Sequence, residues 1–215
     1  KDDFNFIIKK IREADAVVIG APVYLLGIHG YYKMFTDRIV GAYNYYESTK
    51  DKPCIIAIPY GTQGWTGYSR AAALVMPRLL QMKVIDCWFV HATLPGESFM
   101  NRENFDYAGV LAERLFSGES YVPGERECSC CGSDIFRLVS HNRVECVICG
   151  ATGILNAVNI PDFSGIEHNR FTPEEIEEHF NVWLKEMKEK FLNVKDSLKK
   201  VQQKYRDMNW WIKPD

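Results

Sequence analysis

The sequence predicts an α/β protein built on a parallel β-sheet that helices cover on both faces. Two observations carry this prediction. First, residues 16–20, 54–58 and 84–90 are continuous apolar runs rich in Val and Ile. Second, these runs alternate along the chain with segments of helical periodicity. The strands of an antiparallel meander would instead alternate apolar with polar residues. Because crossovers between parallel strands are right-handed, they place the helices on the two faces of the sheet.

The predicted elements follow the order helix, strand, helix, strand, helix, strand, helix. Asp3 can cap the first helix, which carries its apolar residues on one side. These residues are Phe4, Ile7, Ile8 and Ile11. The later helices are expected at about residues 30–42, 69–82 and 106–116.

The composition is typical of a globular protein. The chain has 215 residues, of which 47% are hydrophobic and 25% charged, enough for one large domain or two small ones. A formal net charge of -2 provides no overall basic field for nucleic acid, which is therefore not an expected partner. No run reaches the ~18 apolar residues of a membrane span, and the Lys- and Asp-rich start does not resemble a signal peptide. We expect a cytoplasmic protein without a membrane partner.

Two loops after predicted strands contain apolar residues and glycines where a simple turn would be more polar. They lie at residues 21–30 and 60–67. In an open parallel sheet the carboxyl ends of the strands share one edge, where ligands bind. The second loop offers Gly61 and Gly64 for close backbone approach. We therefore expect a flat aromatic ring between the loops, with backbone groups bonded to its polar edge and side chains over its faces.

An alternative explanation of the two loops needs no ligand. The apolar side chains of the first loop would be core beneath a neighbouring subunit, and the two glycines would be ordinary turn residues. The side chains concerned are Val23, Leu25, Leu26 and Ile28. The residues alone leave both explanations open.

The segment ADAVVIGAPVYLLGIHGYYKMFTDR, residues 14–38, resembles the NADPH-dependent FMN reductase and iron-sulfur flavoprotein branch of the flavodoxin-like superfamily. The resemblance covers about residues 1–117, and IAIPYGTQGWTG stands where those proteins place their second ring-binding loop. It implies a flavodoxin-like doubly wound sheet, FMN as cofactor and NAD(P)H as reductant. It also implies two sets of residues that line the flavin ring. They are Pro22, Val23, Tyr24, Leu25, Leu26, Gly27 and Ile28 on one side, and Gly61, Thr62, Gln63, Gly64 and Trp65 on the other.

The same resemblance implies a phosphate-binding loop after the first strand of the sheet, and this part would precede Lys1. Three parallel strands alone would leave rows of backbone groups unpaired, so the sheet is expected to be incomplete here and completed by a separate stretch of the parent chain. No side chain stands out as an acid or a base, and no catalytic residue is assigned. His29 is left out because a lone loop histidine is more often solvated.

A second motif, CSCCGSDIFRLVSHNRVECVICG, occupies residues 128–150 and holds five of the seven cysteines. Two Cys-x-x-Cys-Gly knuckles, with 14 residues between them, each direct two thiolates at one point. The residues between the knuckles alternate around a Ser-His-Asn turn, as in a hairpin. The expected metal ligands are Cys128, Cys131, Cys146 and Cys149, and Cys130 is expected to be a spare thiol.

The spacing of the two knuckles is similar to that of a zinc ribbon, across about residues 126–155. Structural zinc is favoured, because a unit of this size has too little core to fold unaided. Iron in the same thiolate cage is the rival, and it would carry an electron to or from a flavin. Disulfides are disfavoured because a cytosolic chain keeps its thiols reduced. Cys54 and Cys87 lie in apolar strands and are expected in the core.

The last predicted element is a long amphipathic helix. Thr172, Pro173 and Glu175 form a helix start with a capping box, and an apolar stripe continues from Ile176 to Tyr205. One irregular step in the stripe argues against a long regular coiled coil. At ~1.5 Å per residue the helix reaches ~50 Å, so part of the stripe is expected to meet another subunit of a homodimer or higher oligomer. The alternative is that the helix wraps its own sheet. Trp210 and Trp211 are expected to anchor the tail.

These predictions define three domains. Residues 1–122 form a partial flavodoxin-like FMN-binding domain, residues 123–158 the four-cysteine ribbon, and residues 159–215 a loop and the long helix. The expected function is an FMN-dependent oxidoreductase that passes electrons from NAD(P)H through flavin to a quinone, a metal or another acceptor. The alternative is a non-catalytic electron-transfer or scaffold protein whose ribbon and helix recruit a protein partner.

Overall fold

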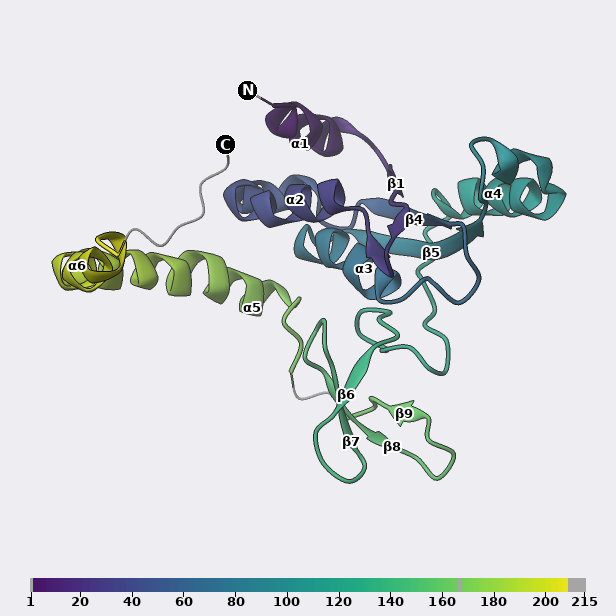
Figure 1. Cartoon of the computed structure of the whole chain (residues 1–215). Coiled ribbons are helices and arrows are strands. Elements are labelled where there is room, and N and C mark those ends of the chain that lie inside the picture. The colour runs from purple at the N-terminus through teal and green to yellow at the C-terminus, as the bar shows by residue number, and fades with distance from the viewer. Residues whose placement is uncertain (1, 166–167, 209–215) are drawn as a thin grey trace. The chain divides into compact units, whose positions relative to one another are not determined.

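The computed structural model describes residues 2–165 and 168–208, except for the side chains of residues 42–45. The chain forms two compact units, Lys1–Pro173 and Glu174–Asp215 (Figure 1). The predicted tail anchors Trp210 and Trp211 lie outside the described residues. Among the helices of the described part, none has the length and the apolar character that crossing a membrane requires.

The first unit contains the predicted parallel sheet, with the strands β1 (Val17–Gly20), β4 (Pro53–Tyr60) and β5 (Lys83–His91). They pair in the order β1-β4-β5, and both pairings are parallel. This confirms the predicted strand type and the three strand positions. The central strand β4 supplies Ile56 and Ile58, which are fully buried.

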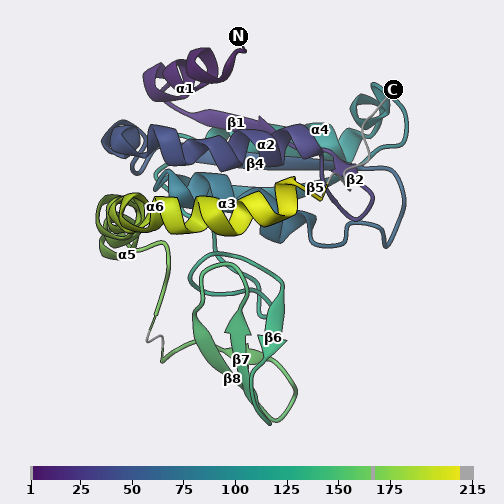
Figure 2. The ribbon, with the colours of Figure 1, turned by 60° about the vertical axis from the view of Figure 1, so that its left-hand side comes forward.

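Helices cover both faces of this sheet, as predicted (Figures 1 and 2). They are α1 (Phe4–Glu13), α2 (Gly30–Arg38), α3 (Ser69–Leu79) and α4 (Arg102–Arg114). One face carries α2 and α3, whose Phe35 and Leu74 belong to the same core cluster as Ile56. On the other face, Leu111 of α4 packs with Ile55 and Ile85. The helix α1 packs against α2, with the ring centroids of Phe4 and Phe35 5.1 Å apart.

The helices differ from the prediction in the cap of α1 and in the bounds of α2, α3 and α4, and α3 ends at Leu79 rather than near residue 82. Asp3 occupies the cap position of α1, but it is the Asp2 carboxylate that accepts a hydrogen bond from the Phe4 amide, at 3.3 Å. After α2 the chain continues as a 3-10 helix, Ile39–Ser48. The helix α4 begins at Arg102 rather than near residue 106, because the Asn101 side chain accepts a hydrogen bond from the Glu103 amide at 2.9 Å. The start of α4 thus follows a local cap that periodicity does not reveal.

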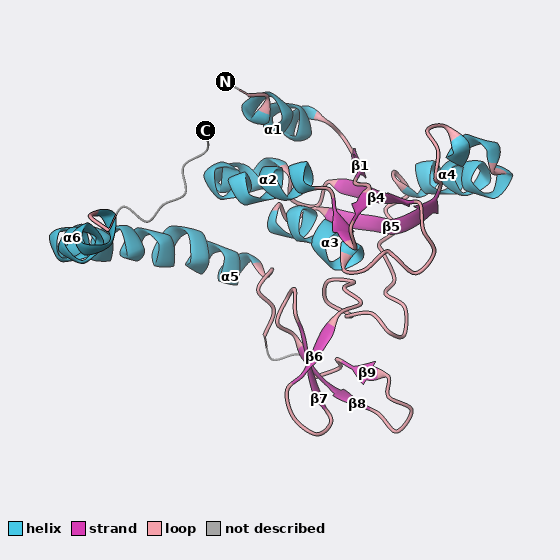
Figure 3. Ribbon diagram, viewed as in Figure 1, coloured by secondary structure: helices cyan, strands magenta, loops and turns pink. Residues whose placement is uncertain are grey.

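The cysteine motif forms a second, antiparallel sheet, separate from the first (Figure 3). Its strands are β6 (Phe136–Leu138), β7 (Arg143–Cys146), β8 (Thr152–Leu155) and β9 (Pro161–Asp162). The pair β6 and β7 is the predicted hairpin. The strands β8 and β9 were not predicted, and they add Phe163 to the small core around the cysteines.

The second unit is the predicted long helix, and it contains an irregular segment. It consists of α5 (Pro173–Glu177), a π-helical segment (Glu178–Trp183) and α6 (Leu184–Arg206). A π-helical turn accommodates an additional residue. The irregular step in the apolar stripe, where Trp183, Met187 and Phe191 follow one another at intervals of four, lies immediately after this segment. Every residue of α6 from Lys188 to Arg206 is exposed in the chain.

We predict that Ile56→Ala destabilises the protein by about 2–5 kcal/mol, because it leaves a cavity in the middle of the sheet. Val122→Ala is the control, since Val122 is 81% exposed, and it should change stability by about 0.5 kcal/mol or less. Denaturant unfolding of the intact protein measures both values. Equal effects of the two variants would contradict the placement of β4 at the centre of the core.

Candidate functional site

The two predicted ring-binding loops leave the same edge of the sheet, at the carboxyl ends of β1 and β4. The first loop forms a small hairpin from β2 (Val23–Tyr24) and β3 (Gly27–Ile28). Its two turn residues, Leu25 and Leu26, have φ values of 48° and 68°. Two-residue hairpin turns of this hand are normally Asn-Gly or similar, because a branched side chain is strained there. The turn is therefore a strained feature placed at the ligand edge.

The second loop holds this strained turn in place. The Tyr68 amide donates a hydrogen bond of 2.9 Å to the carbonyl of Leu26. Beside it, Gly67 approaches so closely that a Cβ atom there would lie 2.0 Å from the same carbonyl oxygen. Only glycine fits this contact, and the φ of Gly67 is also positive, at 51°. Sequence reasoning missed Gly67 and Tyr68, because their partner lies about 40 residues away.

The predicted ring-contacting residues divide into two groups. Tyr24, Leu25 and Trp65 are 61%, 87% and 55% exposed, so the chain itself does not bury them. Val23 and Ile28, in contrast, pack against the main core and anchor the hairpin. The other predicted residues in the exposed group are Pro22, Leu26, Gly61, Thr62, Gln63 and Gly64, while Gly27 is buried. A planar ring bound at this edge would cover these exposed aromatic and branched side chains.

A third loop, after β5, contacts the second one. His91 Nε2 lies 3.2 Å from the carbonyl oxygen of Gly61, and the Thr93 hydroxyl donates to the same oxygen at 3.3 Å. The Glu97 carboxylate accepts the amides of Leu94 and Thr93, and these bonds lower the pKa of Glu97. Sequence reasoning assigned no role to His91. The sequence feature that could have identified His91 is its position at the end of a predicted parallel strand.

An apolar groove of about 590 Å³ adjoins the first loop and runs along β1. β1 pairs with β4 on one side, and among the described residues no strand pairs with its other side. The groove is lined by Tyr24 and Pro22 at the loop and by apolar residues of α1, β1 and α2. Of the described residues that line it, none is Lys, Arg, Ser or Thr. The exposed loop residues therefore fit a planar apolar ring, and the described lining of the groove offers no Lys, Arg, Ser or Thr for a phosphate.

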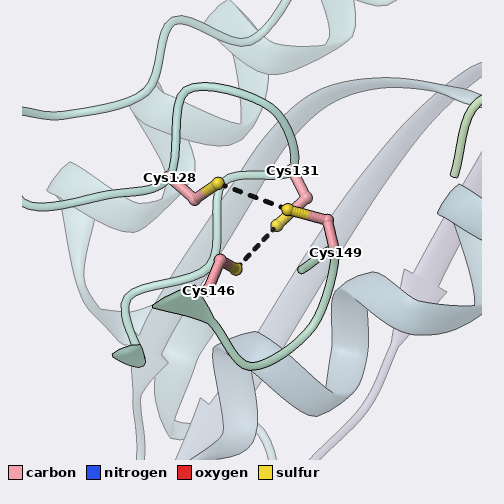
Figure 4. A group of neighbouring side chains, drawn as sticks. All are labelled: Cys128, Cys131, Cys146 and Cys149. Carbon is pink, nitrogen blue, oxygen red and sulfur yellow. Dashed lines mark hydrogen bonds between the residues drawn. The ribbon is translucent and has the colours of Figure 1, made fainter. Parts of the chain in front are cut away.

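The four predicted metal ligands come together in one buried cluster (Figure 4). The sulfurs of Cys128, Cys131, Cys146 and Cys149 all lie within 4.8 Å of one another. Two pairs, Cys128 with Cys149 and Cys131 with Cys146, are 3.5 Å apart. A tetrahedral site with Zn–S bonds of about 2.3 Å has sulfur–sulfur edges of about 3.8 Å, whereas a disulfide is about 2.05 Å long. The cluster has the dimensions of a four-thiolate metal site.

Each knuckle is closed by a matching backbone turn. The Gly132 amide donates to the carbonyl of Cys128 at 2.8 Å, and the Gly150 amide donates to the carbonyl of Cys146 at 2.9 Å. Because the two turns have the same hydrogen-bond pattern, each directs its pair of sulfurs to the same point.

The remaining cysteines have other environments. Burial raises the pKa of both Cys54 and Cys87 to about 12, so these thiols stay protonated in the core, as predicted. Cys130 is only half-buried, and a hydrogen bond with Cys128 raises its pKa to about 11. Cys130 thus lies next to the cluster without belonging to the group of four.

Comparison with known proteins agrees with these observations. Residues 1–93 match the family model of NADPH-dependent FMN reductase. A flavone synthase of Aspergillus candidus is 28% identical over 182 residues, which cover 71% of this chain and 56% of that protein. An iron-sulfur flavoprotein of Methanocaldococcus jannaschii is 46% identical over 37 residues, 17% of this chain and 19% of that protein. The chain spans little more than half the length of the first of these relatives and a fifth of the second.

Among solved structures, a flavone reductase has the same fold. It superposes with a TM-score of 0.76 at 22% sequence identity, over 100% of this chain and 84% of that one. The likeness supports the fold of the chain, including its parallel sheet. Over residues 1–93 the chain is similar to the NADPH-dependent FMN reductase family, and over its whole length it shares the fold of the flavone reductase.

Proposed function

We propose that the protein is an FMN-dependent oxidoreductase that takes a hydride from NAD(P)H and passes the electrons to an acceptor. One observation carries the proposal: the strained Leu25-Leu26 turn, which Gly67 and Tyr68 hold at the ligand edge of the sheet. Strain of this kind costs of order 1–3 kcal/mol per residue and persists only where the surrounding structure over-determines it. We infer that contact with a ligand is what retains two leucines in this conformation.

Different residues of this edge would bind different parts of FMN. We assign Tyr24, Leu25, Leu26 and Trp65 to the faces of the ring, and the backbone of residues 61–64 to its polar edge. Val23 and Ile28 anchor the hairpin that carries the first group. When bound, FMN would supply the hydride chemistry, while these residues bind it, orient it and exclude water.

The phosphate of FMN needs a different set of residues. The groove beside β1 is lined without Lys, Arg, Ser or Thr among its described residues. We therefore assign the phosphate-binding loop, and the strand before it, to a part of the protein outside these 215 residues. The flavone synthase is longer than this chain, which supports the assignment.

The acceptor is proposed from the names of two relatives. One is a flavone synthase and the other a flavone reductase. A flavone is flat and largely apolar, as the exposed side chains at the edge require. We propose a planar conjugated ketone of this kind as the acceptor, with a quinone as the next candidate. In either case NAD(P)H supplies a hydride and water supplies a proton, so the acceptor gains two electrons and two hydrogens.

For the four-cysteine cluster we propose zinc in a structural role. Four thiolates in tetrahedral arrangement suit zinc or iron, and zinc is favoured because a ribbon of this size depends on a metal for its stability. Iron would instead make the site an electron carrier.

A second candidate function rests on the second unit. The apolar side chains Phe191, Val194 and Leu198 of α6 are all at least 40% exposed in the chain. Such a stripe supports a scaffold role, in which the helix binds another protein, or a homodimer in which it meets a second copy. The spectrum of the purified protein separates an enzyme from a scaffold.

We predict that the full-length parent protein is yellow when purified, with a flavin absorption spectrum that NADPH or NADH bleaches in the absence of oxygen. Adding a flavone or a quinone should restore the oxidised spectrum, and the product should contain two more hydrogens. Absorbance and mass spectrometry measure these outcomes. A colourless protein that contains zinc would contradict the proposal and support the scaffold.

We predict that Gly67→Ala weakens FMN binding by tenfold or more, or about 1.4 kcal/mol, because the added Cβ displaces Leu26. Gly118→Ala is the matched control. Gly118 also has a positive φ, of 82°, but a Cβ there meets no atom within 4 Å. Fluorescence titration with FMN gives both affinities. If the two variants lose the same affinity, the loop contact is not what positions the flavin.

We predict that Cys146→Ser removes the metal, because a hydroxyl cannot replace one of four thiolates in the site. Cys130→Ser should keep the wild-type metal content, since Cys130 lies outside the group of four. Elemental analysis of the purified variants tests the assignment and identifies the metal. Retention of metal by Cys146→Ser would show that the ligand set is wrong.

A further inference from the structure

The first knuckle of the ribbon lies along one face of α3, a helix of the flavodoxin-like part. Arg70, Leu74 and Arg78 recur at intervals of four residues, so they lie one above another on that face. All three contact the knuckle or the residues that border it. The contacts join parts of the chain that are about 50 residues apart.

Arg78 makes the contact nearest to the sulfurs. Its Nε and Nη2 atoms both donate to the carbonyl oxygen of Cys131, at 3.3 and 3.2 Å. Cys131 is one of the four metal ligands. A two-pronged contact of this kind fixes both the position of the carbonyl and the plane of the guanidinium.

Arg70 holds both ends of the same knuckle. Its guanidinium lies 3.2 Å from the carboxylate of Glu127 and 4.0 Å from that of Asp134, and it donates to the Tyr121 hydroxyl at 3.0 Å. Glu127 immediately precedes Cys128, and Asp134 follows the knuckle. The Arg70 side chain is only 14% exposed, so water screens these pairs weakly.

Between Arg70 and Arg78, the knuckle is held by close packing rather than by charge. A Cβ atom on Gly132 would lie 2.9 Å from the ring of Tyr121 and 3.7 Å from the Cδ1 atom of Leu74. Gly132 has a φ of 81°, as its turn requires. A larger residue at Gly132 would therefore clash with Tyr121, while Leu74 of α3 lies at ordinary contact distance from the same position.

The charges of this arrangement bear on metal binding. Four thiolates around a divalent metal carry a net charge of -2, and the site is buried. A guanidinium does not lose its proton in proteins, so Arg78 is a permanent positive charge beside the cluster. Residues that contact metal ligands in this way tune affinity, and their loss typically costs 10–100-fold.

We propose that Arg78 is a positioning residue of the metal site: it fixes the first knuckle through Cys131 and offsets the charge of the thiolates. The metal affinity of the ribbon is therefore set partly by α3, outside the ribbon itself. The inference rests on the four-thiolate metal site proposed above. It assigns a role to a residue of the flavodoxin-like part that neither motif predicts.

The test compares three variants of the intact protein by competition for zinc with a chromophoric chelator. Arg78→Gln keeps a hydrogen-bond donor but loses the charge, and its zinc affinity should fall about 10–100-fold. Arg78→Lys keeps the charge and should remain within a few-fold of wild type. Arg114→Gln is the control, because Arg114 forms a similar partly buried pair with Asp86 on the other face of the sheet. Its zinc affinity should equal that of wild type.

A spectroscopic measurement separates charge from mere stability. In the Co²⁺-substituted protein, loss of the positive charge raises the energy of the sulfur electrons. The thiolate-to-cobalt absorption band of Arg78→Gln should therefore move to longer wavelength, and that of Arg78→Lys should not. Circular dichroism confirms that each variant is folded.

Arg70→Gln is the second variant, needed if Arg78→Gln does not fold. It removes a positive charge from the same face of α3 and leaves the Cys131 contact intact, so zinc affinity should fall several-fold. Folded variants with wild-type affinity and an unchanged cobalt band would overturn the inference. If the wild-type protein itself binds neither zinc nor Co²⁺, it is the proposed metal site that fails.

Discussion

The hydrogen bond from the Tyr68 amide to the Leu26 carbonyl is the contact on which the candidate flavin site depends. It joins the loop after β4 to the hairpin after β1, and it holds two leucines in a left-handed conformation that neither would adopt alone. The absent side chain of Gly67 makes the approach possible. Because the two loops are locked together, the exposed side chains of the edge form one surface.

The helix α3 links the loop contact at Tyr68 to the four-cysteine cluster. It begins next to the loop contact at Tyr68, and its Arg70, Leu74 and Arg78 seat the first knuckle of the ribbon. A small ribbon has too little core for independent stability, so attachment to a larger body and binding of a metal act in the same direction. The cysteine module is thereby part of the structure that supports the ligand edge.

Several features of the fold were predictable because they arise from local rules. Apolar runs fixed the three parallel strands, and the Cys-x-x-Cys-Gly spacing fixed the four sulfurs that meet in the cluster. The apolar stripe predicted the long helix but not the π-helical segment before Leu184. Helix ends were less predictable, since the cap at Asn101 and the one at Asp2 depend on which side chain reaches the backbone.

The sequence by itself determined the sheet type, the position of the two loops along the chain and the four cysteines that meet in one cluster, because periodicity and spacing are properties of short stretches of chain. Only the tertiary structure decided which residues hold those features in place. Gly67 matters because of Leu26, His91 lies beside the carbonyl of Gly61, and Arg78 contacts Cys131. Each of these pairs is separated by some 30 to 50 residues, and no local pattern records a contact that forms only when the chain folds back on itself.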